Sequence, residues 1–152
     1  EVFQIRNIAN IVPEYNDPDP VLSLQAGLDF TVTSLKVNNI ILLGHINCGG
    51  CNTCLNPPEN FDEMPYLKEW IGKLNPVKES IEDQLAELDD PVAKSDLMEK
   101  TNIITQYNHL MEYPIIADRV AAGNLKVEGW HFHTDEGFVE VYQPETKTFK
   151  RL

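Results

Sequence analysis

Ile40-Ile41-Leu42-Leu43-Gly44-His45-Ile46-Asn47-Cys48-Gly49-Gly50 is the stretch that decides the fold of this 152-residue chain. Its first four residues are continuously apolar, which is typical of a central parallel strand covered on both faces. The glycines predict a tight loop after the strand, and a short helix should follow to about Leu55. Ligands of open α/β sheets bind at the carboxyl ends of strands, so chemistry is expected at this loop.

The sequence on either side of this stretch predicts alternating strands and helices. We expect a strand at Val2–Ile5 and a helix capped by Asp19 that runs from Pro20 to about Lys36. The region from Pro65 to Ala122 has helical patterns interrupted by prolines, with a long helix from Ser95. Two further strands, Leu125–Phe132 and Phe138–Tyr142, are joined as a hairpin by residues 134–137. Residues 1–152 therefore predict a single α/β domain, with a mostly parallel central sheet, helices on both faces and a C-terminal β-hairpin.

Composition excludes several classes of function. The chain has a net charge of −12, which argues against binding nucleic acid or an anionic membrane surface. Its longest apolar run, Ile40–Leu43, is too short to span a bilayer. The cysteines number three and all lie between Cys48 and Cys54, which favours reduced thiols or metal ligands in the cytoplasm over a secreted disulfide framework. The segment from Glu59 to Glu99 is acidic and predicts a solvated helical face.

The first residues predict a truncated domain. Glu1-Val2-Phe3-Gln4-Ile5 alternates like a half-buried strand, and natural chains seldom begin inside a core strand. We therefore expect a domain that is incomplete at its N-terminus and cut from a longer protein.

His45 and Cys48 have the spacing of metal ligands. Side chains three residues apart reach one ion from a single turn, and imidazole nitrogen with thiolate sulfur suits zinc. The glycines leave room for a small substrate, and the start of the following helix favours a thiolate at Cys48. His-x-x-Cys alone is weak evidence; in a strand–loop–helix setting it is stronger.

The chain resembles a known family in three stretches. They are Phe3-Gln4-Ile5-Arg6-Asn7-Ile8-Ala9-Asn10-Ile11-Val12-Pro13, then Leu35-Lys36-Val37-Asn38-Asn39 continuing through Gly50, and Glu128-Gly129-Trp130 followed by the hairpin and Pro144-Glu145-Thr146. The Arg-Asn-x-Ala-Asn and Gly-His-x-x-Cys-Gly-Gly motifs, in this order, are similar to those of the β-class carbonic anhydrases.

This resemblance implies zinc held by one His and two Cys, of which His45 and Cys48 match two. It also implies a small apolar substrate pocket at Phe3, Ile8 and Phe30, beside Gly49 and Gly50. The family usually has Tyr at Phe30, so a hydroxyl is missing there. The first zinc Cys and the catalytic Asp–Arg pair of the family lie in a Cys-x-Asp-x-Arg motif, expected upstream of Glu1. Residues 1–152 by themselves should therefore be inactive.

The activity implied is reversible hydration of carbon dioxide to bicarbonate and a proton by zinc-bound hydroxide. The family further implies a homo-oligomer, a dimer or a multiple of dimers, with an apolar contact near Arg6–Val12 and the 21–35 helix. The location implied is cytoplasmic, or an organelle stroma or matrix in a eukaryote.

Other readings of the same residues remain open. A related zinc hydrolase of another small linear molecule, such as carbon disulfide, would use the same site. Cys48, Cys51 and Cys54 also allow a non-catalytic metal or redox module, although an iron–sulfur cluster needs a fourth Cys and helical spacing favours Cys51 and Cys54 as core residues.

Three further histidines and one arginine are candidate site residues. His131 and His133 share one strand face and allow a second metal site, but a solvent-facing or interface pair that hydration does not need is favoured. His109, late in the long helix, has no predicted role. Arg6 either binds an anion such as bicarbonate or holds its loop by an ion pair.

Overall fold

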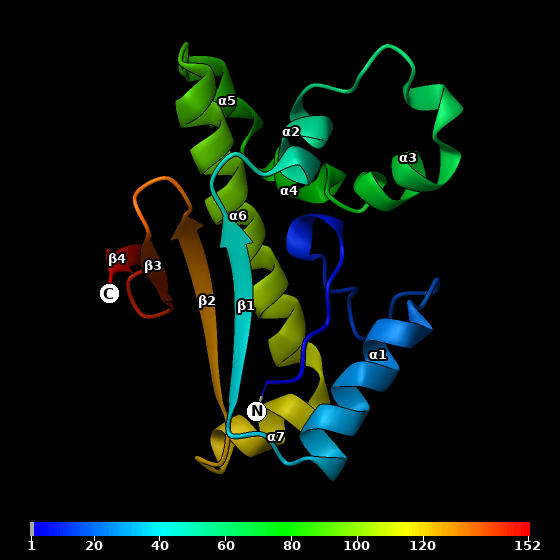
Figure 1. The fold of residues 1–152 in the computed structure, drawn as a ribbon, viewed down its shortest axis with the longest axis vertical. Helices are drawn as coiled ribbons and strands as arrows, with labels where there is room; N and C mark the ends of the chain where they lie inside the picture. Colours follow the sequence, from blue (N-terminus) through cyan, green and yellow to red (C-terminus); the bar gives the residue numbers. More distant parts are fainter. Residues whose placement is uncertain (1) are drawn as a thin grey trace.

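The computed structural model describes residues 2–152, which form strands, helices and short helical turns (Figure 1). The strands are β1 (Asn39–His45), β2 (Lys126–His133), β3 (Phe138–Gln143) and β4 (Thr148–Arg151). The helices are α1 (Leu22–Asp29), α2 (Gly49–Leu55), α3 (Pro65–Gly72), α4 (Asn75–Ser80), α5 (Glu82–Glu87), α6 (Pro91–Glu112) and α7 (Pro114–Ala121). The turns are η1 (Ile8–Asn10), η2 (Phe30–Ser34) and η3 (Phe61–Glu63).

The sheet has the order β1-β2-β3-β4. The β1–β2 pair is parallel, and the β2–β3 and β3–β4 pairs are antiparallel. The α/β class and the predicted hairpin are confirmed, but the sheet is mixed and not mostly parallel. The reason is that β2, β3 and β4 follow one another through short turns, which produce antiparallel neighbours. The strand β4 was not predicted.

Helix α6 covers one face of the parallel pair (Figure 1). A Cβ added at Gly44 or Gly129 would lie 2.6 Å or 2.8 Å from the side chain of Ile103, so glycine permits this close approach. On the opposite face Ile41 and Leu43 are 45% and 51% exposed. Within residues 2–152, helices therefore do not cover both faces as expected. The Ile40–Leu43 strand was expected to be central, but β1 lies at the edge of the described sheet.

The segment Val2–Ile5 is not a strand, contrary to the prediction. Alternation predicts a strand only where a neighbouring strand completes its backbone hydrogen bonds, and no described strand pairs with it. Its side chains are exposed, and the Phe3 ring lies 6.0 Å from that of Phe30.

Two predicted helix boundaries also shift. The first helix begins at Leu22 and passes into η2 at Phe30. The long helix begins at Pro91, behind an Asp90 cap, because proline favours the first turn of a helix.

Two apolar clusters form the core, and α6 contributes residues to both. One packs α1, α7 and the strands around Ile103 and Leu110. The other packs α2, α3 and α4 around Met98 and Leu74. The clusters lie at opposite ends of the parallel pair, so α6 fixes the position of α2 relative to β1 (Figure 1).

A stripe of polar side chains on α6 binds the backbone of residues 9–13. Asn102 donates to the Ala9 carbonyl (2.9 Å), and Gln106 accepts from the Val12 N–H (2.7 Å). His109 Nδ1 donates to the Val12 carbonyl (2.7 Å), and the Tyr113 hydroxyl donates to Pro13 (2.9 Å). Because Ala9 and Asn10 have positive φ of 61° and 44°, these bonds support a backbone that non-glycine residues rarely adopt.

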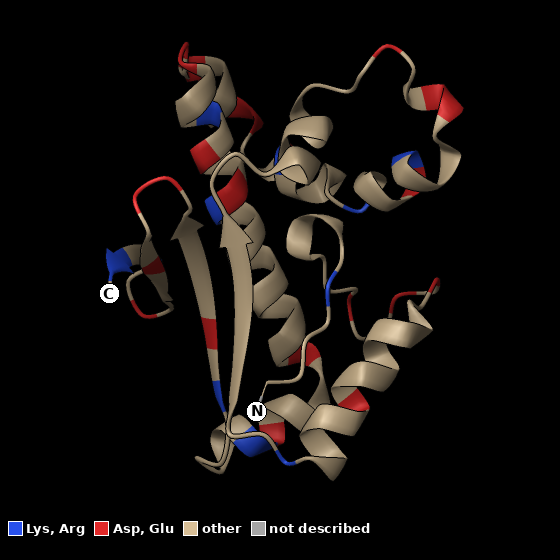
Figure 2. Ribbon diagram, in the orientation of Figure 1, with Lys and Arg blue, Asp and Glu red and all other residues tan. Residues whose placement is uncertain are grey.

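Acidic side chains gather on α5, the start of α6 and the loop before α3 (Figure 2). The predicted solvated face is confirmed for most of the Glu59–Glu99 segment, whose carboxylates are exposed. Glu99 is the exception, because only 3% of it is exposed. None of the described helices combines the length and the apolar character needed to cross a bilayer.

Candidate metal-binding loop

The loop after β1 is held between the sheet and two helices. β1 ends at His45, and the Ile46 N–H donates to the Phe132 carbonyl of β2 (3.0 Å). α2 begins at Gly49, with Cys48 as its N-cap residue, and ends at Leu55, which confirms the short helix predicted to follow the loop. The loop therefore lies at the carboxyl end of the parallel pair, the usual ligand-binding edge of such sheets.

His45 is exposed and its ring is oriented by its neighbour. Its Nδ1 lies 2.8 Å from the Ile46 carbonyl, which only accepts hydrogen bonds. Nδ1 therefore donates this bond, and in the neutral ring the Nε2 lone pair is available to a ligand. A backbone carbonyl on the second ring nitrogen is the usual arrangement of a metal-binding histidine.

Cys48 is buried, with 5% of its surface exposed. A hydrogen bond from the Cys51 thiol lowers the pKa of Cys48, assisted by the Cys51 and Gly50 backbone N–H groups and by His45; burial opposes them, and the pKa lies at about 6 against an ordinary 9.0. The same thiol–thiol bond and burial raise the pKa of Cys51. Cys48 is therefore the thiolate of the pair, and thiolate is the form that ligates a metal.

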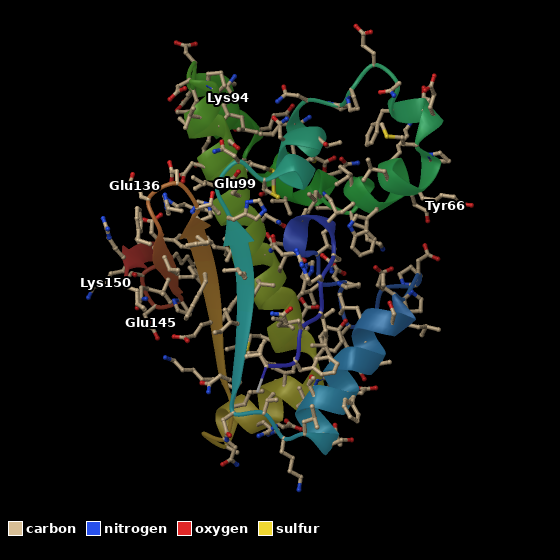
Figure 3. All side chains as sticks on the ribbon, in the orientation of Figure 1. Tyr66, Lys94, Glu99, Glu136, Glu145 and Lys150 are labelled. Carbon is tan, nitrogen blue, oxygen red and sulfur yellow. The ribbon has the colours of Figure 1, made fainter. Side chains whose placement is uncertain are left out.

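Glu99 holds this loop from α6, and the sequence analysis did not identify it. Its Oε1 accepts from the Cys48 N–H (2.8 Å) and from Ser95 Oγ (2.9 Å), and its Oε2 lies 3.1 Å from His131 Nε2. Burial would raise the pKa of Glu99, but the bonds from His131, Cys48 and Ser95 outweigh it and hold the pKa below its ordinary value. In Figure 3 this side chain lies where α6 passes the tip of β1. The one signal in the sequence is helical spacing, which places Glu99 on the same face of α6 as the buried Asn102 and Gln106.

The structure groups the predicted pocket residues into two pairs. Phe3 lies against Phe30, and both side chains are about half exposed. Ile8 packs over Gly50, since a Cβ there would lie 2.8 Å from Ile8 Cγ2. Gly49 faces open space, with no atom within 4 Å of an added Cβ.

Other predicted residues have different surroundings. Cys51 and Cys54 lie in the apolar cluster around α2, as helical spacing suggested. His131 is 0% exposed, so the solvent-facing reading of this histidine is wrong: α6 covers its face of β2, and alternation does not say which face is covered. Arg6 is exposed.

The described residues supply two ligands at the loop. Among them the one group of three or more His, Cys, Asp or Glu with clustered ligand atoms is His131, His133 and Glu140, which is separate from His45 and Cys48. The free Nε2 of His45 and the acidic thiol of Cys48 nevertheless match the donor set of a borderline-soft cation.

The comparisons with known proteins agree with one another. A family model described as "Carbonic anhydrase" matches residues 1–139. The carbonic anhydrase of Helicobacter pylori strain J99 is 30% identical, over 100% of this chain and 70% of that protein. Beta carbonic anhydrase 3 of Arabidopsis thaliana is 29% identical, over 97% of this chain and 57% of that protein.

Solved structures show the same likeness. The β-carbonic anhydrase CcaA matches with a TM-score of 0.88 and 27% identity, over 99% of this chain and 71% of that one. A structure from a study of two tetrameric β-carbonic anhydrases of Sordaria macrospora matches with a TM-score of 0.73 and 25% identity, over 97% of this chain and 66% of that one.

Proposed function

The chain belongs to the β-class of the carbonic anhydrase family, whose members hydrate carbon dioxide, and we propose that it does so with zinc held by His45 and Cys48. The assignment of ligands rests on one observation: the same loop carries a free His45 Nε2 and a Cys48 thiol whose pKa lies at about 6. Both side chains lie on one loop at the carboxyl end of β1.

The residues of the chain prepare this loop for a small apolar substrate. The Ile46 carbonyl orients His45, and Glu99 anchors the backbone of Cys48. Gly49 leaves open space, and Ile8 presents an apolar side chain beside Gly50. Zinc, when bound, lowers the pKa of a water molecule so that hydroxide is available near neutral pH.

An open catalytic zinc site needs three protein ligands. His45 and Cys48 are two, and Cys51 keeps its proton and donates a hydrogen bond to Cys48 within an apolar cluster. We therefore propose that the third ligand and the Asp–Arg pair of the family lie outside the described residues. Phe3, Phe30 and Ile8 complete the proposed substrate pocket.

The test of the function is stopped-flow hydration of carbon dioxide by the full-length protein, before and after chelation. His45→Asn should abolish turnover, because Asn lacks the imidazole lone pair. His109→Gln is the matched control. His109 of α6 donates a hydrogen bond to the Val12 carbonyl, and the Gln amide can donate in its place. Turnover that survives chelation, or turnover of carbon disulfide but not of carbon dioxide, would overturn the proposal.

A homo-oligomer, a dimer or a multiple of dimers, is the proposed state of assembly. Ile8, Leu22 and Leu35 expose 50%, 72% and 49% of their surfaces, in the segments expected to make the contact, and contiguous exposed apolar surface marks interaction sites. Sedimentation showing a stable monomer at micromolar concentration would contradict this.

For the location we propose the cytoplasm, or an organelle stroma or matrix in a eukaryote. Its support is that Cys48, Cys51 and Cys54 are all free thiols, which persist in reducing compartments. Cell fractionation is the measurement.

A further inference from the structure

We propose that His131, His133 and Glu140 form a second divalent-metal site, distinct from the Cys48 loop and suited to zinc or cobalt. The site lies between the β2–β3 hairpin and the first half of α6. It does not depend on the proposed function of the loop.

The backbone register brings the three side chains together. His131 and His133 are two residues apart on β2 and so project from the same face, and Glu140 of β3 lies directly opposite His131. Glu140 Oε2 is 2.8 Å from His133 Nε2 and 3.7 Å from His131 Nδ1. Ligands of a tetrahedral zinc ion are about 3.3 Å apart, so small side-chain movements would produce that geometry.

One ring nitrogen of His131 has no hydrogen-bond partner. Its Nε2 donates to Glu99 Oε2, and its Nδ1, which carries a lone pair in the neutral ring, is buried without a partner. The lone pair faces Glu140 Oε2 at 3.7 Å and Asp96 Oδ1 at 3.9 Å. A buried lone pair directed at carboxylates is unfavourable unless a proton or a metal ion lies between them, and we propose the metal ion.

The other nitrogen of His131 has the partner that a metal ligand usually has. Metal-binding histidines commonly donate their second N–H to a carboxylate, which fixes the ring and increases its basicity. Glu99 is that carboxylate here, and it is itself held by Ser95 and by the Cys48 N–H. The arrangement is a carboxylate–histidine pair whose free nitrogen points at two further oxygen ligands.

Lys100 is the competitor for this position. Its Nζ lies 2.9 Å from Glu140 Oε2 and 3.1 Å from Asp96 Oδ1. The carboxylates of Asp96, Glu99 and Glu140 outnumber this single cation, which leaves a net negative charge around His131. A metal ion would displace the ammonium group from Glu140, so removing the charge of Lys100 should strengthen metal binding.

Cobalt separates the two sites, because a thiolate ligand gives an intense charge-transfer band and a His–carboxylate site does not. The metal-free full-length protein is dialysed against cobalt, and total bound metal is compared with saturation of the thiolate band. We expect about one equivalent beyond that which saturates the band. Cys48→Ser should remove the band and keep this extra equivalent, whereas His133→Asn and Glu140→Gln should do the reverse.

Two further variants complete the test. Lys100→Met should raise the affinity for the extra equivalent at least about tenfold, the lower end of the effect of an outer group on metal affinity. Glu145→Gln, an exposed carboxylate in the turn between β3 and β4, is the matched control and should change neither site. Circular dichroism melts confirm folding of each variant. No extra equivalent in either the wild type or Lys100→Met would show that His131 is satisfied by a proton alone and would overturn the proposal, as would extra metal that survives both His133→Asn and Glu140→Gln.

Discussion

The Cys48 loop and the β2–β3 hairpin both present metal-ligand side chains at the carboxyl end of the β1–β2 pair, but they differ in completeness. The loop has an acidic thiol and an oriented imidazole, and the described residues supply two ligands. The hairpin brings three ligands together but holds a lysine beside them. A site can therefore be chemically prepared while geometrically incomplete, or the reverse. Glu99 joins the two regions, because it binds the Cys48 N–H and His131 at once.

The largest effect should come from Cys48→Ser. A hydroxyl does not ionise near neutral pH, so the loop loses its thiolate. Replacing groups that merely support metal ligands costs about 10–100-fold in affinity, and we expect more than about 100-fold here, with loss of carbon dioxide hydration. Cys54→Ala is the matched control: it removes a buried thiol from the same helix and should lower stability by about 1 kcal/mol while zinc content stays unchanged. Equal zinc loss in both variants would break the distinction between Cys48 and its neighbours.

Glu99→Gln should weaken both regions at once. The amide keeps the shape of the carboxylate but loses its charge, and its NH₂ would face a donor of Cys48, Ser95 or His131. We expect a loss of about 1–3 kcal/mol in the free energy of unfolding and about 10–100-fold in zinc affinity at the loop. Denaturant unfolding and metal titration measure the two effects. Full zinc affinity in a destabilised variant would show that Glu99 is structural only.

Substitutions at the adjacent Gly49 and Gly50 should have different effects, one on substrate binding and the other on core packing. Gly50→Ala places a Cβ 2.8 Å from Ala9 Cβ and Ile8 Cγ2 and 3.2 Å from the Ala9 backbone nitrogen, so we expect a loss of about 1–3 kcal/mol by overpacking. Gly49→Ala meets nothing within 4 Å and should keep its melting temperature while lowering kcat/KM, since we propose that Gly49 lies in the substrate pocket. If both variants kept the melting temperature and the kcat/KM of the wild type, the packing role of Gly50 and the pocket position of Gly49 would both be contradicted.

The smallest effect is expected away from both regions, at the Lys73–Asp17 ion pair. Its atoms lie 2.8 Å apart on side chains that are 26% and 17% exposed. The bond from Lys73, followed by that from the Asp19 N–H, lowers the pKa of Asp17 below its ordinary 3.8. A lowered pKa stabilises the fold above pH 3.8, and this contribution is lost as pH falls through the lowered value.

Lys73→Met should therefore reduce stability near neutral pH by less than about 1 kcal/mol. The difference from wild type should shrink in acid, which melts across pH would measure. Metal content should be unchanged, and a change would mean that long-range electrostatics, not local contacts, set metal binding.

Much of the fold was predictable because its signals are local. Prolines begin α6 and α7, a turn joins β2 to β3, and the spacing of His45 and Cys48 is contained within one loop. Val2–Ile5 was not predictable in this way, since a strand forms only beside a partner. β4 has four residues, which is too short for alternation of apolar and polar side chains to indicate a strand.

The parts of the site that the sequence missed depend on contacts between distant segments. Nothing near Glu99 in sequence indicates that α6 passes behind β1 and meets the Cys48 N–H. The alternation around His131 predicts a strand but does not say which face α6 covers. The sequence therefore places Glu99 in a predicted solvated segment and His131 in a predicted solvent-facing or interface pair, whereas the packing of α6 on the sheet buries both.

Anomalous diffraction at the zinc edge, from crystals of the full-length protein, would locate the metal. If zinc binds where β1 meets α2, as we propose, it should show a strong peak bonded to His45 Nε2 and Cys48 Sγ. A metal bound at Cys51 and Cys54 with Cys48 unligated, or no metal at this loop in an enzyme that hydrates carbon dioxide, would contradict it.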